Sequence, residues 1–145
     1  MSERIVFTDI EATLVSYLAN RLAAVSDTAE VVTVVPDPAP ARLVRISRDD
    51  RKGRMDREDR DGFRGAHLIL DRPRIILECG DSSGAAAELA STVRSILSSA
   101  APGYIGTVWC DHLEDVGLEH TTDPVTAAPR YVITTDLVVR GTVAD

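Results

Sequence analysis

The clearest structural signal in this chain is the stretch RYVITTDLVVR, residues 130–140. Successive side chains of a β-strand point to opposite faces. One face of this stretch would carry Tyr131, Ile133, Thr135, Leu137 and Val139, and the other Arg130, Val132, Thr134, Asp136, Val138 and Arg140. The pattern therefore predicts a strand with one mainly apolar face and one mixed face.

Five other segments favour strands. They are residues 104–113, 73–79, a shorter run at 67–70, the alternating stretch 42–48, and the β-branched run 31–35.

The proline-rich residues 36–40 cannot continue the strand at 31–35, because proline offers no backbone donor. We therefore expect an extended turn there, with residues 31–35 antiparallel to 42–48. Residues 117–128 are expected to form a polar loop.

Two segments have the periodicity of amphipathic helices. The first is predicted at Asp9 to Ala24, with Thr8 or Asp9 as its cap. Its apolar stripe would be Ile10, Leu14, Tyr17, Leu18, Leu22 and Val25, with Arg21 at the edge. The second would open at residues 81–84 with a serine as N-cap and end at Pro102-Gly103. Its buried stripe would be Ala86, Leu89, Ala90, Val93, Ile96 and Leu97.

The order of these elements predicts an α+β fold, in which a mostly antiparallel or mixed sheet is flanked by two helices. A length of 145 residues suits one core. Residues 1–145 are thus predicted to form a single domain, with residues 48–66 as a long charged loop protruding between strands.

The segment Arg48 to Arg64 contains seven basic and six acidic residues, and only Met55 and Phe63 could anchor it to a core. Most connections need only about 2–6 residues. Two interpretations stay open: a solvated loop, or a protrusion that orders against a neighbouring subunit. The second makes interface candidates of Arg51, Lys52, Arg54, Arg57, Arg60 and Arg64.

The formal net charge is −7, and it argues against tight general binding to DNA, which needs several cations on phosphates. No apolar run approaches the roughly 20 residues of a membrane span, and the N-terminus has no secretory h-region. Cys79 and Cys110 lie far apart, and we expect both to be buried thiols in a reducing compartment.

No catalytic, cofactor-binding or metal-binding residue is predicted, and we expect no enzyme. Asp111 and His112 are adjacent on a predicted strand, so their side chains should diverge. The acidic group Asp111, Glu114, Asp115 and Glu119 lacks the spacing of a calcium loop and reads as a solvated strand end. Residues 80–84 lack the lysine of a phosphate-binding loop, and helix capping explains them better.

Aromatic residues are few. Phe7, Tyr17 and Tyr131 are expected in the core. Trp109 would be either a core residue or an interface anchor, since tryptophan is enriched at binding hot spots.

Several segments resemble tail terminator proteins of long, non-contractile-tailed (siphovirus-type) phages. Residues 9–18 (DIEATLVSYL) are similar to the family's opening helix, and the strand at 31–36 with its prolines is similar too. So are residues 72–79 (RPRIILEC) leading into Ser82, the alanines 85–87 and the run 89–97. The ending 129–141 (PRYVITTDLVVRG) fits a last strand closed by Arg-Gly.

The resemblance implies a virion protein, assembled in the host cytoplasm, that forms a homo-oligomeric ring of six subunits. Such a ring caps the tail tube, stops its polymerisation and offers a joining surface to the head. Its partners would be the tail tube protein and a head-completion or connector protein. DNA would pass through the channel without specific binding. The family brings no catalytic residues. The alternatives are another neck or head–tail connector protein and, less favoured, a small cytosolic enzyme.

Overall fold

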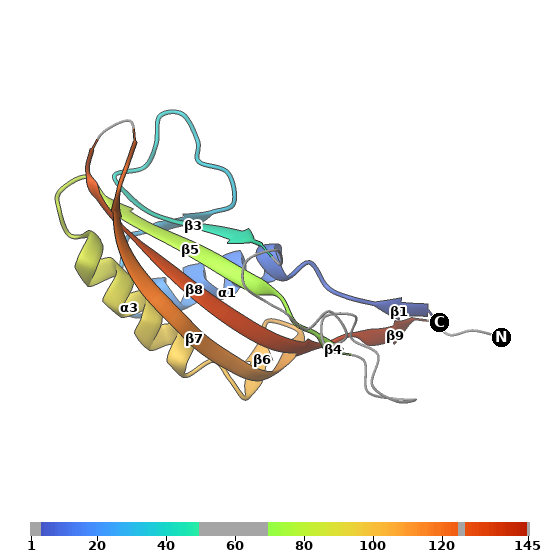
Figure 1. Cartoon of the computed structure of the whole chain (residues 1–145). Coiled ribbons are helices and arrows are strands. Elements are labelled where there is room, and N and C mark those ends of the chain that lie inside the picture. The colour runs from blue at the N-terminus through green and yellow to red at the C-terminus, as the bar shows by residue number, and fades with distance from the viewer. Residues whose placement is uncertain (1–3, 50–69, 125–126, 145) are drawn as a thin grey trace.

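The computed structural model describes residues 4–49, 70–124 and 127–144, and these form an α+β fold (Figure 1). In chain order the elements are β1 (Arg4–Val6), α1 (Ile10–Ala24), β2 (Glu30–Val32), β3 (Arg42–Arg48), β4 (Leu70–Asp71), β5 (Arg74–Asp81), α3 (Ala86–Ser98), β6 (Gly103–Ile105), β7 (Val108–Thr122), β8 (Pro129–Arg140) and β9 (Thr142–Ala144). The predicted fold class is confirmed, and residues 67–69 of the expected short strand lie outside the described residues.

The main sheet has the strand order β2-β3-β5-β8-β7-β6, with β4 paired to β8. All its pairs are antiparallel except β2–β3, which is parallel, with Val31 opposite Val44. The expected antiparallel pairing of these two strands is therefore wrong. A tight hairpin uses a connection of about 2–5 residues, and the proline-rich segment 33–41 instead returns the chain to the same end of the sheet.

Helix α1 begins where the sequence predicts. The Asp9 side chain accepts a hydrogen bond from the backbone N–H of Ala12 at 3.2 Å. At the other end, the N–H of Ser26 bonds the carbonyl of Ala23 at 3.0 Å and that of Asp27 bonds Leu22 at 2.9 Å, while Ser26 has φ +62°. This is the Schellman arrangement, and it turns the chain so that Asp27 lies beside the sheet.

Helix α3 begins later than expected, and its N-cap is not a serine. Ala85 occupies the cap position and makes no side-chain capping bond. The preceding turn is closed instead by Asp81, whose carboxylate accepts bonds from the Ser83 N–H at 2.7 Å and the Ser83 hydroxyl at 2.6 Å. Asp side chains compete well for nearby backbone donors, which is why the serines are used in the turn. The predicted buried stripe of α3 is confirmed in full.

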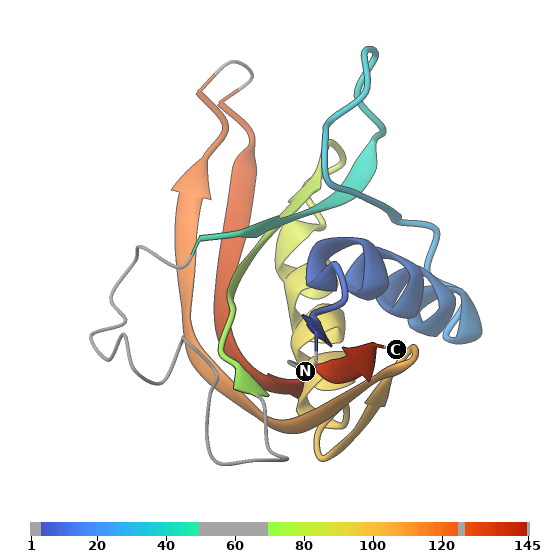
Figure 2. The same cartoon turned by 90° about the vertical axis from the view of Figure 1, so that its right-hand side faces the viewer.

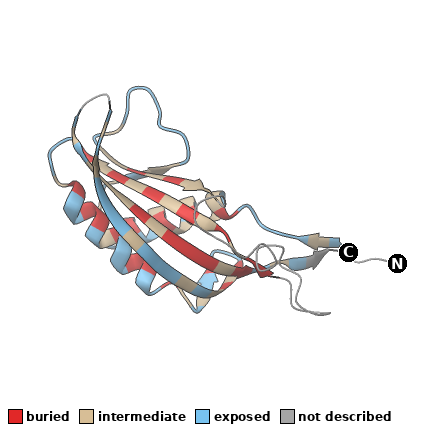
Figure 3. Cartoon of the chain, viewed as in Figure 1, coloured by how far each residue is buried: buried red, intermediate tan, exposed pale blue. Residues whose placement is uncertain are grey.

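Both helices pack on one face of the sheet, and the sheet curls around them (Figure 2). Helix α1 contacts β2 and β3 toward one edge and β6 at the other, and it also contacts α3. The residues that face the helices alternate along each strand, as the banded burial pattern makes visible (Figure 3). On the sheet side the core comprises Val44, Ile46, Ile75, Leu77, Cys79, Ile105, Val108, Cys110, Ile133, Leu137 and Val139.

The sequence fails to predict how β6 and β7 are divided. The expected strand at 104–113 is interrupted by a turn at Gly106, which has φ +62°, and the expected loop at 117–128 is strand as far as Thr122. Most side chains from His112 onward on β7 are exposed, so they show no apolar alternation. Register shifts at Cys110/His112 and Asp115/Gly117 disrupt the period of two further.

A short antiparallel ribbon formed by β1 and β9 extends from the body and brings both ends of the described chain together (Figure 1). Neither strand of this ribbon was predicted from the sequence. Phe7 follows β1 and is 40% exposed, so its expected place in the core is wrong. Tyr17 and Tyr131 do pack against the core, whereas Val25, expected in the stripe of α1, is exposed at the helix end.

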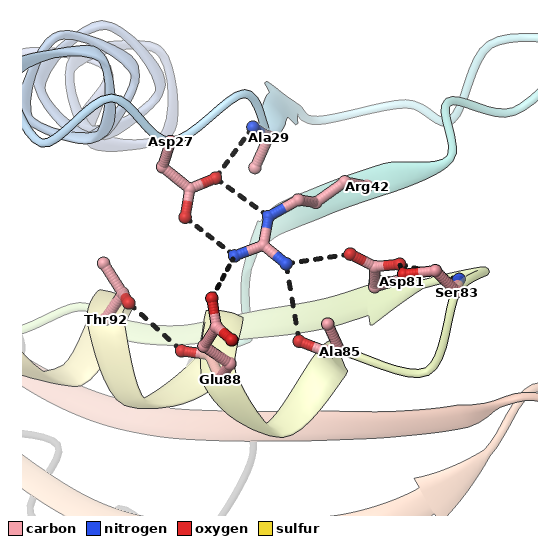
Figure 4. Close-up of polar contacts among 8 residues, drawn as sticks. All are labelled: Asp27, Ala29, Arg42, Asp81, Ser83, Ala85, Glu88 and Thr92. Carbon is pink, nitrogen blue, oxygen red and sulfur yellow. Dashed lines mark hydrogen bonds and ion pairs between the residues drawn. The ribbon is translucent and has the colours of Figure 1, made fainter.

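Arg42, at the start of β3, binds groups from three other parts of the chain (Figure 4). Its Nε and Nη2 contact the two oxygens of Asp27 at 2.9 and 2.8 Å, and its Nη1 contacts Asp81 Oδ2 at 2.8 Å. Nη1 also lies 3.4 Å from the carbonyl oxygen of Ala85, and Glu88 is 3.9 Å from Nη2. One guanidinium therefore joins the end of α1, strands β3 and β5, and the beginning of α3.

We expect Arg42→Ala to lower the free energy of unfolding by about 3 kcal/mol, because it leaves two largely buried carboxylates without their counter-ion. The control is Arg94→Ala, which breaks an exposed pair with Asp115 and should cost at most about 1 kcal/mol. Urea denaturation of both variants measures the difference. Equal losses would show that the Arg42 cluster has no special role.

Stability should also fall in acid because of this cluster. Hydrogen bonds from Ser83 and Arg42 lower the pKa of Asp81 to about 2, and the Arg42 hydrogen bond lowers the pKa of Asp27. Both folded-state values lie below the ordinary 3.8, so the stabilisation is complete above about pH 4 and is lost as the pH falls toward 2. The free-energy gap between the native protein and Asp81→Asn should therefore narrow as the pH falls from about 4 to about 2. A gap that stays constant over this range would contradict the assignment.

Candidate functional site: the open face of the sheet

The face of the sheet opposite the two helices, here called the open face, carries the polar side chains of the central strands. It presents Leu43, Arg45 and Ser47 from β3, Arg74, Ile76, Glu78 and Gly80 from β5, and Arg130, Val132, Thr134, Asp136 and Val138 from β8. The alternation predicted for residues 130–140 and 42–48 is confirmed. The open face is thus fixed by the same period of two that builds the core.

At one end of the open face, Glu78 on β5 is shared by two arginines. Arg45 Nη1 lies 3.1 Å from Glu78 Oε1, and Arg130 Nη1 lies 3.2 Å from Glu78 Oε2. Arg45 is directly opposite Glu78 in the register, and Arg130 is opposite the neighbouring Gly80. The Nε of Arg130 is buried and has no hydrogen-bond partner. Two guanidinium groups therefore share one carboxylate at this point.

In the middle of the open face, Arg74 and Asp136 form a two-point pair across β5 and β8. Nε and Nη2 of Arg74 bind the two carboxylate oxygens at 2.7 and 2.8 Å, and both side chains are nearly buried. The Asp136 hydrogen bond is the main cause of a raised pKa at Arg74. Such two-point pairs fix both position and orientation, so these charges serve the sheet rather than an external anion.

At the other end, next to the β1–β9 ribbon, lies an aromatic pair. The rings of Tyr104 and Trp109 meet edge to face, with centroids 5.0 Å apart, and Tyr104 is 65% exposed. Trp109 Nε1 donates to Asp111 Oδ1 at 3.0 Å, and Arg140 binds both oxygens of Asp111. A hollow of about 470 Å³ lies over these residues.

Trp109 is half-buried and stands outside the core cluster, so of the two interpretations the core one is not supported. Its role as an interface anchor stays a prediction. The other predicted interface residues, Arg51, Lys52, Arg54, Arg57, Arg60 and Arg64, lie outside the described residues, and their role also stays a prediction. The cluster of Arg45, Glu78 and Arg130 was not predicted from the sequence. Its only signal there is a polar residue that recurs on one face of each strand.

The two cysteines are buried free thiols, as expected. Burial raises the pKa of Cys79 to about 12 and also raises the pKa of Cys110. Since the thiolate is the reactive form, neither sulfur is prepared for nucleophilic chemistry.

The pair Asp111–His112 diverges as predicted: Asp111 binds Arg140 and Trp109, while His112 is exposed. The hydrogen bond from Arg140 is the main cause of a lowered pKa at Asp111. Of the neighbouring acids, Asp115 pairs with Arg94 at 2.7 Å. Within the described part of the chain no group of three or more His, Cys, Asp or Glu residues is arranged to hold a metal ion.

No model of a known protein family matches this chain. No curated protein matches it significantly in sequence either. Neither described helix is long and apolar enough to cross a membrane.

Proposed function

We propose that this chain is a phage tail terminator, a structural protein whose ring caps the tail tube, stops its polymerisation and forms the joining surface for the head. The observation that carries the proposal is the resemblance in residues 9–18, 72–79 and 129–141. These segments correspond to α1, β5 and β8, which are the first helix and two adjacent central strands. The resemblance therefore falls on the parts that build the core, and this supports a shared architecture.

The distribution of exposed apolar groups supports assembly into a ring. Near the β1–β9 ribbon, Val6, Phe7 and Tyr104 are exposed. The segment 33–41, which lies away from the ribbon (Figure 1), carries the exposed Val34 and Val35. A closed ring needs two different patches on each subunit that meet around an axis. Two chemically distinct ends satisfy this requirement better than one self-complementary patch.

The charge of the chain suits a channel through which DNA moves. The net charge is −7, and the arginines of the open face at 45, 74, 130 and 140 each contact a carboxylate. A guanidinium that is already paired has less to gain from a phosphate. The paired arginines therefore suit a surface past which DNA moves without binding.

The proposed location of the protein is the tail or neck of the virion.

The ring is tested by mass photometry of the purified protein, alone and with tail tube protein. We expect a species near six times the 15.7 kDa subunit mass. Emission of the single tryptophan should shift to shorter wavelength on assembly if Trp109 anchors the interface. Immunogold labelling at the tail–head junction separates a tail or neck protein from a small cytosolic enzyme. A monomer under all these conditions, together with its absence from virions, would refute the proposal.

Double-stranded DNA should not be retained at physiological salt, so a gel-shift dissociation constant should be weaker than about 1 μM. A matched variant, Glu78→Gln with Asp111→Asn, removes the partners of Arg45, Arg130 and Arg140. It should bind DNA more tightly than the native protein at low salt, with a steeper salt dependence. Tight binding by the native protein would contradict the proposed channel surface.

A further inference from the structure

Strand β7 forms an outer edge of the main sheet over most of its length (Figure 2). Its inner side pairs with β8 as far as Thr122, whereas β6 pairs with its outer side from Val108 to Cys110. Within the residues that the structure describes, no strand pairs with the outer side of β7 from Asp111 to Thr122. In an antiparallel pair, every second residue turns both backbone groups away from its partner strand. This edge therefore presents backbone donors and acceptors to an incoming strand.

The last part of this edge, residues 117–122, has a regular geometry that suits strand pairing. Val116 is the extra residue of the second bulge, and from Gly117 to Thr122 the register with β8 advances one residue at a time. Bulges and lysines commonly protect edge strands, and this stretch contains neither. None of its side chains is buried. A two-stranded hairpin that buries little surface is marginally stable, so a third strand would stabilise it.

Two exposed carboxylates on β7 lack a counter-ion. Glu114 and Glu119 form no ion pair within the described part of the chain, and β7 itself contains no lysine or arginine. The other two acidic residues of the strand are each bound to an arginine. Arg74, whose charge acts on Glu114 at a distance, is bound to Asp136 at 2.7 and 2.8 Å. The edge is therefore complementary to a strand that carries lysine or arginine.

The register of β7 fixes the spacing of these two carboxylates. Glu114 is opposite Asp136 and Glu119 is opposite Val132, and these two β8 residues lie four positions apart on the open face. The bulge thus absorbs the odd residue and brings both carboxylates to the same face. An added strand without a bulge would meet them with residues i and i+4, which share a face. Leu118 lies on the other face and is 42% exposed.

We propose that an extended segment of a partner protein, in which basic and apolar residues alternate, adds to β7 as a further strand. Its backbone bonds to residues 117–122, its basic residues at i and i+4 pair with Glu114 and Glu119, and its apolar residues cover Leu118. A second copy of β7 is a poorer occupant, because like charges opposite each other in a sheet are destabilising. This inference goes beyond the proposed function and concerns the single subunit.

The test is titration of the full chain with the synthetic peptide Lys-Val-Thr-Val-Lys-Val, which has lysines at i and i+4. We expect binding that weakens as salt is added, with slower hydrogen exchange at the backbone amides of residues 117–122. The matched peptide with Glu in place of Lys should bind at least about tenfold more weakly. N-methylation of alternate residues removes the donors of one peptide edge, so it should abolish binding in one of its two registers and spare it in the other.

Three variants of the chain make the test specific. Glu114→Gln with Glu119→Gln should weaken binding of the Lys peptide at least about tenfold, with the melting temperature nearly unchanged because both side chains are exposed. Glu119→Lys should bind the Glu peptide more tightly than the native protein does. The control is Glu30→Gln, which removes an exposed carboxylate from β2 at the opposite edge of the sheet and should leave binding unchanged.

The proposal is overturned if the Lys peptide has no dissociation constant below about 1 mM at low salt, or if it protects the amides of β2 instead of residues 117–122. Equal affinity for the Lys and Glu peptides would overturn it as well. Self-association of the native chain that protects the β7 amides without peptide would show that a second copy occupies the edge, which also contradicts the proposal. None of these outcomes decides whether the chain forms a ring on a tail tube, so the two proposals fail separately.

Discussion

The guanidinium of Arg42 is the interaction on which the arrangement of this fold depends most directly. Three of its nitrogens bind carboxylates that follow α1 and end β5, and a fourth contact reaches the first carbonyl before α3. Packing of apolar stripes alone lets a helix slide along a sheet, because the hydrophobic effect is non-directional. Hydrogen bonds from a planar guanidinium are directional, so they fix where both helices stand on one face.

Because both helices lie on the same face of the sheet, the open face stays exposed to solvent and carries polar side chains. The open face has no helix to bury it, and its polar groups are satisfied by their neighbours across strands, as in Arg74–Asp136 and Arg45–Glu78. These pairs also specify the register. A shift of one residue would move Val44 and Ile46 to the open face and bring Arg45 into the core. The ion pairs and the apolar face therefore favour the same alignment of β3 and β5.

The parts of the fold that the sequence predicts are those where one period of burial extends over a whole element. Strands β3 and β8 and the stripe of α3 meet this condition, and their faces were assigned correctly. Strand β7 does not, because it is exposed over most of its length and bulged twice. Strand β2 pairs in parallel with β3, and β1 pairs with β9. In both cases the rest of the fold determines which strand is the partner. Short strands carry too little periodicity to reveal such partners.

The contacts of the candidate site are also only partly predictable from the sequence. Trp109 could be singled out because tryptophan is rare and favours interfaces, but its contacts with Tyr104 and Asp111 depend on the turn at Gly106, which the sequence did not predict. Arg45, Glu78 and Arg130 lie on three separate strands. Each residue alone reads as an ordinary charged surface group. Only the register of β3, β5 and β8 brings two arginines to one carboxylate.

The two ends of the open face differ in chemistry, and this difference constrains any assembly built from the chain. One end offers a groove beside exposed valines, and the other offers an aromatic pair beside the Arg140–Asp111 pair. A two-fold dimer buries the same patch on both subunits, so it would leave one of these ends uncovered. A head-to-tail arrangement engages both ends on every subunit. Head-to-tail contacts form a ring when the rotation between subunits closes and an open filament when it does not. The proposed function requires the closed form.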